Sequence, residues 1–277
     1  SLPESDLGGP LFKEQYKKDA ANTLINYLKK SSVGESITYT KMRLSDRELC
    51  ECLKTKASRV DSNSGTMILD LEEKSADFIW NNVFKHKQRK YINRFERDGF
   101  ETNSGTDISD LKKFYTLYRH NWKYSGYPSN YKFFENMFSL LHPNNFSITL
   151  IEKEGECIGA GMNFIYDEKK TIYMAGVALN KNVSSRYKIY YKLRWETIKY
   201  AYRNGYRHVS LGPTPSDTSE VHHKLKSKFG AEFNQDYYLY IPLDEKLFFL
   251  RENAIKIGRK TKNVLPKTLL MKMQRRL

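Results

Sequence analysis

Three consecutive segments with the pattern of β-strands constrain the fold of this chain more than any other feature. They cover residues 146–153, 157–166 and 171–179. Gly155 lies in the first connection and residues 167–170 form the second, so both connections are short enough for hairpins. The pattern therefore predicts an antiparallel meander of three strands.

The residues after this meander predict an alternation of helices and strands. A helix over 185–204 is followed by Gly205, which is placed to end it. A strand over 207–211, a helix over 217–229 and a strand over 237–242 come next. This order is typical of an α/β (α+β) protein with a mixed sheet flanked by helices. One face of the 185–204 helix consists of Tyr187, Tyr191, Trp195, Ile198 and Tyr202.

The first half of the chain predicts a region that is richer in helices. Residues 61–65 (DSNSG) have the composition of a turn, Gly99 is placed to end a helix, and Asp107 is placed to begin the next one. We interpret this half as an incomplete copy of the unit formed by the second half, with helices added. Helices are expected over 12–30, 46–54, 75–97, 107–122 and 131–141, and strands over 36–44 and 66–71.

Composition excludes several classes of protein. No apolar run approaches the ~18 residues of a membrane-spanning helix, and 20 Tyr, 15 Phe and 3 Trp are too many large rings for a disordered chain. Cys50, Cys52 and Cys157 cannot form a disulfide framework, which favours the reducing cytosol, and no Cys/His spacing suggests a metal site. Because the chain begins at Ser1 rather than Met, we expect a preceding segment.

Clustered positive charge indicates a polyanionic partner. The formal net charge is +15, and six Lys or Arg meet one Glu in residues 84–97. Nine Lys or Arg meet one Glu in residues 251–276, within a basic amphipathic tail over 244–277. Such clusters predict binding to tRNA, to another nucleic acid, or to the anionic face of a membrane.

Four short segments, taken in order, give the chain a family resemblance. It resembles the Fem-type (FemAB-like) peptidyltransferases and their GNAT-like acyltransferase relatives. The resemblance implies two GNAT-like units: an incomplete one over 1–105 and a second one over 106–243 that is followed by the tail. The segments are residues 7–11 (LGGPL), 87–94 (KQRKYINR) with Gly99, 195–205 leading to Leu211-Gly212, and 224–231 (KLKSKFGA).

The resemblance also implies an activity. Fem-type enzymes transfer an aminoacyl group from aminoacyl-tRNA to an amine, typically of a peptidoglycan precursor, and need no cofactor besides the acyl donor. For this chain we therefore expect a cytoplasmic aminoacyltransferase with a lipid- or nucleotide-linked amine acceptor. Peripheral contact with the inner face of an anionic membrane is a further expectation, made from the basic tail.

Lys226 is the first candidate for the active site. In the family a Lys at this position meets the 3′ end of the acyl-tRNA, although the family usually has Phe where this chain has Leu225. A cation there can hold a phosphate or ribose and offset developing negative charge. Arg89, Lys90 and Arg94 are either a phosphate-binding face or a solvated helix face.

The other candidates are substrate-binding residues. Gly212 begins the segment 212–215 (GPTP), which predicts a strand-to-helix turn with free N–H groups or an ordinary rigid turn. Phe229 is expected to close its helix rather than touch substrate. The remaining candidates are Asn163 and Tyr173 on the meander, Arg186 and Tyr190 beside or on the 185–204 helix, and His223 as a base. Arg194 lies on the same helix and is not among the candidates.

Two other functions stay open. A CoA-dependent N-acetyltransferase normally has a Gly-rich loop that cradles pyrophosphate before this helix, and residues 180–187 contain no Gly. That weakens acyl-CoA as the donor without excluding it. The second alternative is a non-catalytic protein that binds RNA or a membrane surface through its basic faces.

Overall fold

The computed structural model describes residues 14–33, 37–122, 129–167 and 170–261. The chain divides into two compact units. The large unit is built on Ser64–Gln235, and the small unit combines Gly9–Asn63 with Asp236–Leu277. Two long strands, β2 (Arg59–Asp70) and β8 (Glu232–Pro242), each continue from one unit into the other. The predicted domains 1–105, 106–243 and 244–277 stay a prediction.

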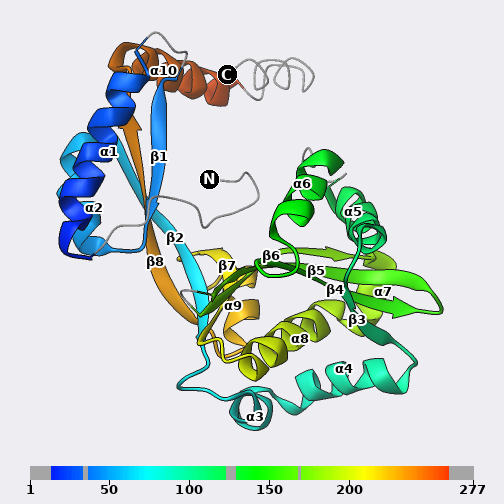
Figure 1. Cartoon of the computed structure of the whole chain (residues 1–277). Helices are drawn as coiled ribbons and strands as arrows, with labels where there is room; N and C mark the ends of the chain where they lie inside the picture. The colour runs from blue at the N-terminus through cyan, green and yellow to red at the C-terminus, as the bar shows by residue number, and fades with distance from the viewer. Residues whose placement is uncertain (1–13, 34–36, 123–128, 168–169, 262–277) are drawn as a thin grey trace. The chain divides into compact units, whose positions relative to one another are not determined.

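The small unit is a short antiparallel sheet with helices. The strand order is β1-β8-β2, and α1 and α2 pack on it through Ala21, Ile25, Leu49, Leu53 and Leu239. Its described elements are a 3₁₀-helix (Glu14–Tyr16), α1 (Lys17–Ser31), β1 (Tyr39–Leu44), α2 (Arg47–Leu53), a second 3₁₀-helix (Lys54–Lys56), the first part of β2 (Arg59–Asp70), the last part of β8 (Glu232–Pro242) and α10 (Glu245–Thr261) (Figure 1).

The large unit has a six-stranded mixed sheet in the order β2-β7-β6-β5-β4-β3. Its described elements, besides β2 and β8, are α3 (Ala76–Phe78), a π-helix (Ile79–Val83), α4 (His86–Arg97), β3 (Glu101–Gly105), α5 (Ile108–Trp122), α6 (Tyr131–Leu141), β4 (Phe146–Lys153), β5 (Glu156–Tyr166), β6 (Thr171–Leu179), α7 (Lys181–Tyr187), α8 (Ile189–Arg203), β7 (His208–Pro215) and α9 (Val221–Ser227).

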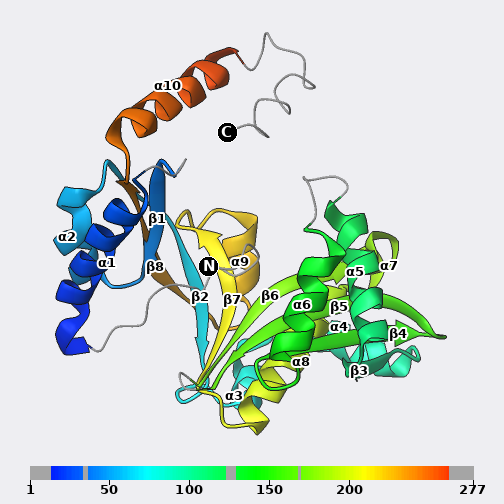
Figure 2. The same ribbon diagram turned by 45° about the horizontal axis from the view of Figure 1, so that its top comes forward.

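Helices cover both faces of this sheet, as Figure 2 shows. Helices α5 and α6 lie on one face, where Phe114 and Phe134 pack against Phe146 and Phe164. Helices α4 and α8 lie on the other face, and their core includes Trp195 and Ile198. Burial on both faces explains why β5 and β6 are apolar along almost their whole length.

The parallel pair β6–β7 positions the site. The strands from β3 to β6 run antiparallel to their neighbours, as do β2 and β7. The register of β6 on β7 covers three residue pairs and ends at Tyr173 with Ser210. Beyond these residues the two strands separate, which leaves room between them for side chains and a ligand.

Several predictions of secondary structure are confirmed. The antiparallel meander is present as β4, β5 and β6, and the predicted helices over 107–122 and 131–141 are α5 and α6. Asp107 accepts hydrogen bonds from the backbone N–H of Ser109 and Asp110, as expected for the start of a helix. The predicted short helix over 46–54 is α2, with Asp46 as its N-cap.

Two predictions about the first half are wrong. Residues 61–65 are not a turn but part of β2, where the position of a Cβ on Gly65 would lie against the backbone O of Asn234. The helix predicted over 75–97 is interrupted at Phe84 and Lys85, which are extended. The strand β3 was not predicted at all.

The second half needs similar corrections. The helix predicted over 185–204 is divided into α7 and α8 by Lys188, whose φ of 58° is left-handed. Residues 212–215 are not a turn, because they continue β7 and pair with β2. The helix predicted over 217–229 shrinks to α9, since Asp217 accepts a hydrogen bond from the Ser219 N–H in a turn before it.

Candidate active site

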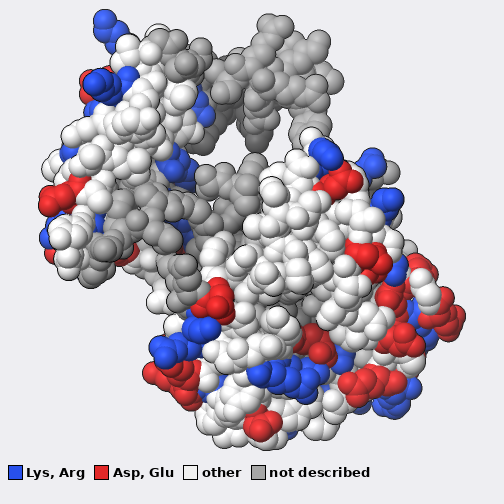
Figure 3. Space-filling model, viewed as in Figure 1, with Lys and Arg blue, Asp and Glu red and all other residues white. Residues whose placement is uncertain are grey.

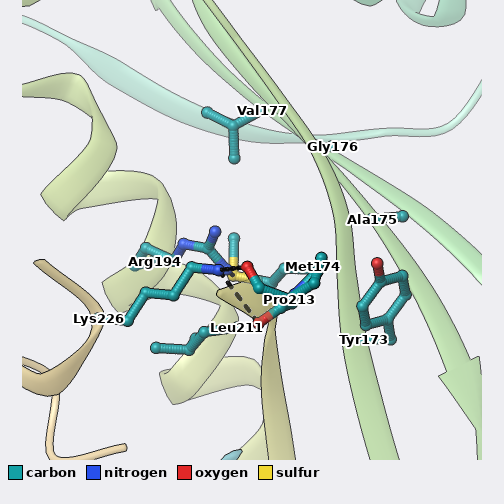
Figure 4. A pocket seen from close by; sticks show the side chains of 10 residues that line it. Tyr173, Met174, Ala175, Gly176, Val177, Arg194, Leu211, Pro213 and Lys226 are labelled. Atoms are coloured by element: carbon teal, nitrogen blue, oxygen red, sulfur yellow. Dashed lines mark hydrogen bonds between the residues drawn. The ribbon is translucent and has the colours of Figure 1, made fainter. Parts of the chain in front are cut away.

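A cavity of about 290 Å³ opens where β6 and β7 lose their pairing. Residues 173–177 of β6 and 211–213 of β7 form its walls, and Arg194 of α8 and Lys226 of α9 contribute their side chains (Figure 4). No Asp, Glu or His belongs to the described lining. The cavity therefore combines two cations with backbone polar groups and apolar side chains.

Lys226 is held inside this cavity by backbone carbonyl groups. Only 7% of the residue is exposed, and its Nζ donates hydrogen bonds to the backbone O of Gly212, at 3.1 Å, and of Pro213. Gly212 has a φ of 81°, in a region that a side chain would strain. The sequence therefore provides Gly where β7 bends its carbonyl groups toward the ammonium.

Arg194 reaches the same cavity from α8. The residue is 5% exposed, its Nη1 donates to the Sδ of Met174 at 2.8 Å, and its guanidinium lies 4.8 Å from the ring centre of Tyr190. Its Nε is buried without a hydrogen-bond partner in the described part of the chain. A thioether is a weak acceptor, so this guanidinium has unused donor capacity.

A second hollow, of about 570 Å³, lies beside α4. Its lining includes four cationic side chains, and on the face shown in Figure 3 basic side chains lie over α4 next to acidic ones. The hollow itself has no carboxylate in its described lining. The lining residues are Trp80, His86, Arg89, Lys90, Asn93, Arg94 and Arg97.

The cations that line this hollow differ in their hydrogen bonds to the protein and in their exposure. Arg89 has a structural role, since its Nη1 donates to the backbone O of Trp80, Asn81 and Phe84 and so joins the π-helix to α4. Arg94 donates from Nε to Asp98, and this hydrogen bond lowers the pKa of Asp98 below its usual range. Lys90 is exposed.

Comparison with known proteins identifies the fold that carries these two hollows. Residues 83–224 match the family model of the acetyltransferase (GNAT) domain, which is just over half of the chain. The chain belongs to the GNAT family. The protein is therefore an acyltransferase, and the predicted relation to GNAT-like enzymes is confirmed. No curated protein sequence matches this chain.

Solved structures share the GNAT fold over most of this chain. "FemX" aligns with a TM-score of 0.66 at 15% identity and covers 85% of this chain and 80% of its own. L-PGS from Bacillus licheniformis aligns at 0.61 and 14%, covering 84% and 75%. A tandem GNAT protein from the clavulanic acid biosynthesis pathway aligns at 0.57 and 9%, covering 86% and 73%. At these identities the likeness shows the fold.

Within this GNAT protein the cavity between β6 and β7 brings together part of the predicted site. Tyr173 and Gly212 line it beside Lys226, and the Tyr173 ring lies parallel to that of Phe164 at 6.4 Å. Tyr190 does not belong to the described lining of the cavity, but its ring lies against the guanidinium of Arg194. Phe229 is fully buried and packs against Tyr190 at 5.8 Å, which agrees with the expected packing role.

Besides Tyr190 and Phe229, three more predicted residues lie outside the described lining of both hollows. Asn163 is 4% exposed and is engaged with Ser147 and Thr197 inside the core. Arg186 is exposed, with its guanidinium 5.3 Å from the ring centre of Tyr187. His223 lies beside Phe233, with ring centres 5.6 Å apart. For these residues the predicted substrate contacts stay predictions.

Arg194 was not among the predicted site residues, although the sequence contained a signal for it. Arg194 lies three residues after Tyr191 and four before Ile198, next to the apolar stripe of α8. A charged residue at such a position is buried with the stripe, and burial of an Arg demands a partner or a function. The pattern could therefore have marked Arg194 before the structure did.

The described residues also bear on the chemistry of thiols and of metal ligands. Burial raises the pKa of the Cys157 thiol to about 11, so this group stays protonated near neutral pH. In the ranges that the structure covers, no group of three His, Cys, Asp or Glu side chains is arranged to hold a metal ion. Among the described helices none is both long and apolar enough to cross a membrane.

Proposed function

We propose that this GNAT protein is an aminoacyltransferase that moves an aminoacyl group from aminoacyl-tRNA to an amine. The observation that carries the proposal is the buried ammonium of Lys226, fixed by two carbonyl groups at the opening between β6 and β7. Its position in the segment KLKSKFGA is the position that resembles the Fem-type motif.

The proposed reaction requires the cavity to stabilise negative charge that develops during the transfer. A neutral amine attacks the ester carbonyl of the donor, a C–N bond forms, and the C–O bond to the ribose breaks. The proton lost by the amine goes to the departing ribose oxygen. Negative charge develops on the carbonyl oxygen in between, and a fixed cation such as Lys226 would stabilise it.

The segment before α8 supports tRNA over CoA as the donor. A pyrophosphate cradle needs free backbone N–H groups, but here the N–H of Ser184 bonds to Asn180 O at 2.8 Å and that of Lys188 to Ser184 O at 2.9 Å. The N–H of Asn182 bonds to the Asn180 side chain. Residues 181–187 form α7, so these donors are occupied inside the segment itself.

The hollow beside α4 supports a second contact with phosphate. Lys90 and Arg97 are exposed in its lining, and Trp80 offers an aromatic surface. Cations next to an aromatic ring are a common arrangement for single-stranded nucleic acid. We assign this hollow to the phosphates of tRNA or of a nucleotide-linked acceptor.

Helix α10 supports the alternative of a lipid-linked acceptor. Phe249, Leu250 and Ile257 are 68%, 67% and 63% exposed, although they are large apolar residues. Lys246 and Lys256 belong to the same helix. Exposed apolar residues with neighbouring Lys suit the surface of an anionic membrane. Residues 262–277 of the predicted basic tail lie outside the described residues.

The donor is the first part of the proposal to test. Incubation with a labelled aminoacyl-tRNA pool and an amine acceptor should yield an RNase-resistant amide product, whereas labelled acetyl-CoA should yield none. The acceptor is offered both free and in anionic vesicles, since the structure supports a soluble and a lipid-linked acceptor. Product from acetyl-CoA alone would overturn the proposal in favour of an N-acetyltransferase.

Changing the exposed cations beside α4 tests the second contact. The double variant Lys90→Ala, Arg97→Ala is expected to weaken tRNA binding about tenfold at low salt, because two phosphate contacts are lost. The slope of log affinity against log salt should become shallower by about 0.7–0.9 for each contact. Lys112→Ala, Lys132→Ala removes two exposed charges of α5 and α6 as a matched control. Equal losses of tRNA affinity in the two double variants would argue for non-specific electrostatic attraction.

A further inference from the structure

Two buried cations share the cavity between β6 and β7. Lys226 is 7% exposed and Arg194 is 5% exposed, and no carboxylate belongs to the described lining. Arg194 touches the Met174 side chain of β6, and a Cβ on Gly212 of β7 would lie within 4 Å of both Met174 O and Lys226 Nζ. The cavity is therefore a concentrated positive site.

Another buried cation on the same helix has carboxylate partners, unlike Arg194. Lys192, also on α8, is 2% exposed, and its Nζ lies 3.2 Å from Glu96 and 2.8 Å from Glu196. Two carboxylates thus neutralise Lys192, whereas Arg194 contacts a thioether and an aromatic ring. Burial of a charge without a counter-charge is unfavourable, so the site of Arg194 favours an anion.

We propose that Arg194, beside Lys226, binds one phosphate group of the donor. This deepens the proposed function and rests on it only in assigning the phosphate to the donor. A guanidinium offers parallel N–H groups that match phosphate oxygens, and the unpartnered Nε of Arg194 is one such group. In Figure 4 the side chains of Arg194 and Lys226 both project toward the space between β6 and β7.

The carbonyl groups at Lys226 fit this assignment. Gly212 and Pro213 hold the ammonium of Lys226 by hydrogen bonds and so fix its position in the cavity. The ring face of Tyr190 positions the Arg194 guanidinium but carries no net charge. Arg194 is thus in place before an anion arrives, which reduces the ordering cost of binding.

Binding of small phosphates to the full chain tests the site without any activity assay. Pyrophosphate and AMP, whose 5′-phosphate resembles that of a terminal RNA nucleotide, are titrated calorimetrically into the wild type and Arg194→Met. We expect the variant to bind at least about tenfold more weakly, the effect of one charged hydrogen bond. Arg203→Met removes an exposed Arg from the end of α8 as the matched control and should leave both affinities unchanged.

A structural role for Arg194 predicts a different result. Removal of an uncompensated buried charge should leave the thermal midpoint without ligand equal or higher, whereas loss of a structural contact should lower it. Arg194→Lys keeps the charge and should retain part of the affinity, which keeps the test readable if the Met variant fails to fold. Wild-type affinity in the folded Lys and Met variants, or no phosphate binding by the wild type, would overturn the proposal.

CoA in the same titration separates this proposal from the proposed function. Binding of CoA that depends on Arg194 and exceeds that of AMP would support the phosphate site and contradict tRNA as the donor. Binding of aminoacyl-tRNA that is unaffected in Arg194→Met, together with unchanged affinity for pyrophosphate, would overturn the phosphate site and leave the proposed function standing.

Discussion

Lys226→Ala is expected to slow aminoacyl transfer by roughly 10²–10³-fold, the effect of removing one preorganised group that stabilises an oxyanion. The side chain is buried at the opening between β6 and β7 and is fixed by the carbonyl groups of Gly212 and Pro213. Single-turnover kinetics with labelled aminoacyl-tRNA measure the chemical step directly. A rise in KM at constant kcat would instead show that the ammonium contributes only uniform binding.

Two neighbouring lysines provide the control for this prediction. Lys224 and Lys228 lie close to Lys226 in the sequence but are exposed, so Ala at either position should leave the rate within about twofold of wild type. Lys226→Met keeps much of the side-chain volume and guards against a simple packing defect. Comparable losses at all three lysines would point to general electrostatic attraction and contradict a specific role.

Gly65→Ala is expected to destabilise the protein by about 3 kcal/mol, which is large for the addition of one methyl group. The added Cβ would lie 2.5 Å from Cζ of Phe233 and closer still to the backbone O of Asn234. A backbone carbonyl cannot turn away as a side chain can, so β2 or β8 must move. Urea denaturation gives the change in the free energy of unfolding, provided that the m-value stays constant.

Gly161→Ala is the matched control for Gly65→Ala. Gly161 is also a buried strand residue of the large unit, but the nearest atom to its added Cβ is Cδ2 of Leu193 at 3.6 Å, an ordinary contact. The variant should be neutral, or more stable by up to about 1 kcal/mol, because Ala loses less entropy than Gly on folding. Similar destabilisation at both positions would show that close approach of β8 is not the cause.

Elements that depend on residues close together in the sequence were predicted correctly, whereas elements that depend on distant contacts were not. The meander was predictable because its apolar strands and short turns are adjacent in the sequence. The break at Phe84 was not, since it depends on Arg89 bonding backward to three carbonyl groups and on Gln88 accepting from the Lys85 N–H. Residues 61–65 look like a turn alone and become a strand only with a partner at Asn234.

The residues of the candidate site differ in the same respect: the sequence alone marks some of them, and only the folded structure marks the others. Lys226 was found because it belongs to a short motif, and Gly212 because it follows a predicted strand. Arg194 acquires its meaning only when β6 and β7 part and α8 places its guanidinium between them. Spacing along the chain marks Arg194 as a charged residue beside the apolar stripe, but it does not show that the guanidinium faces a cavity rather than the core.

The pairing of β1 with β8 has a consequence for the order in which the chain folds. Tyr39 pairs with Pro242, so roughly two hundred residues separate the partners, while Ser64–Gln235 is one continuous segment. On the ribosome the first helices and β1 emerge long before the strand that completes their sheet. The large unit can thus fold before β8 is available to β1, so elements synthesised before the large unit complete their sheet after it.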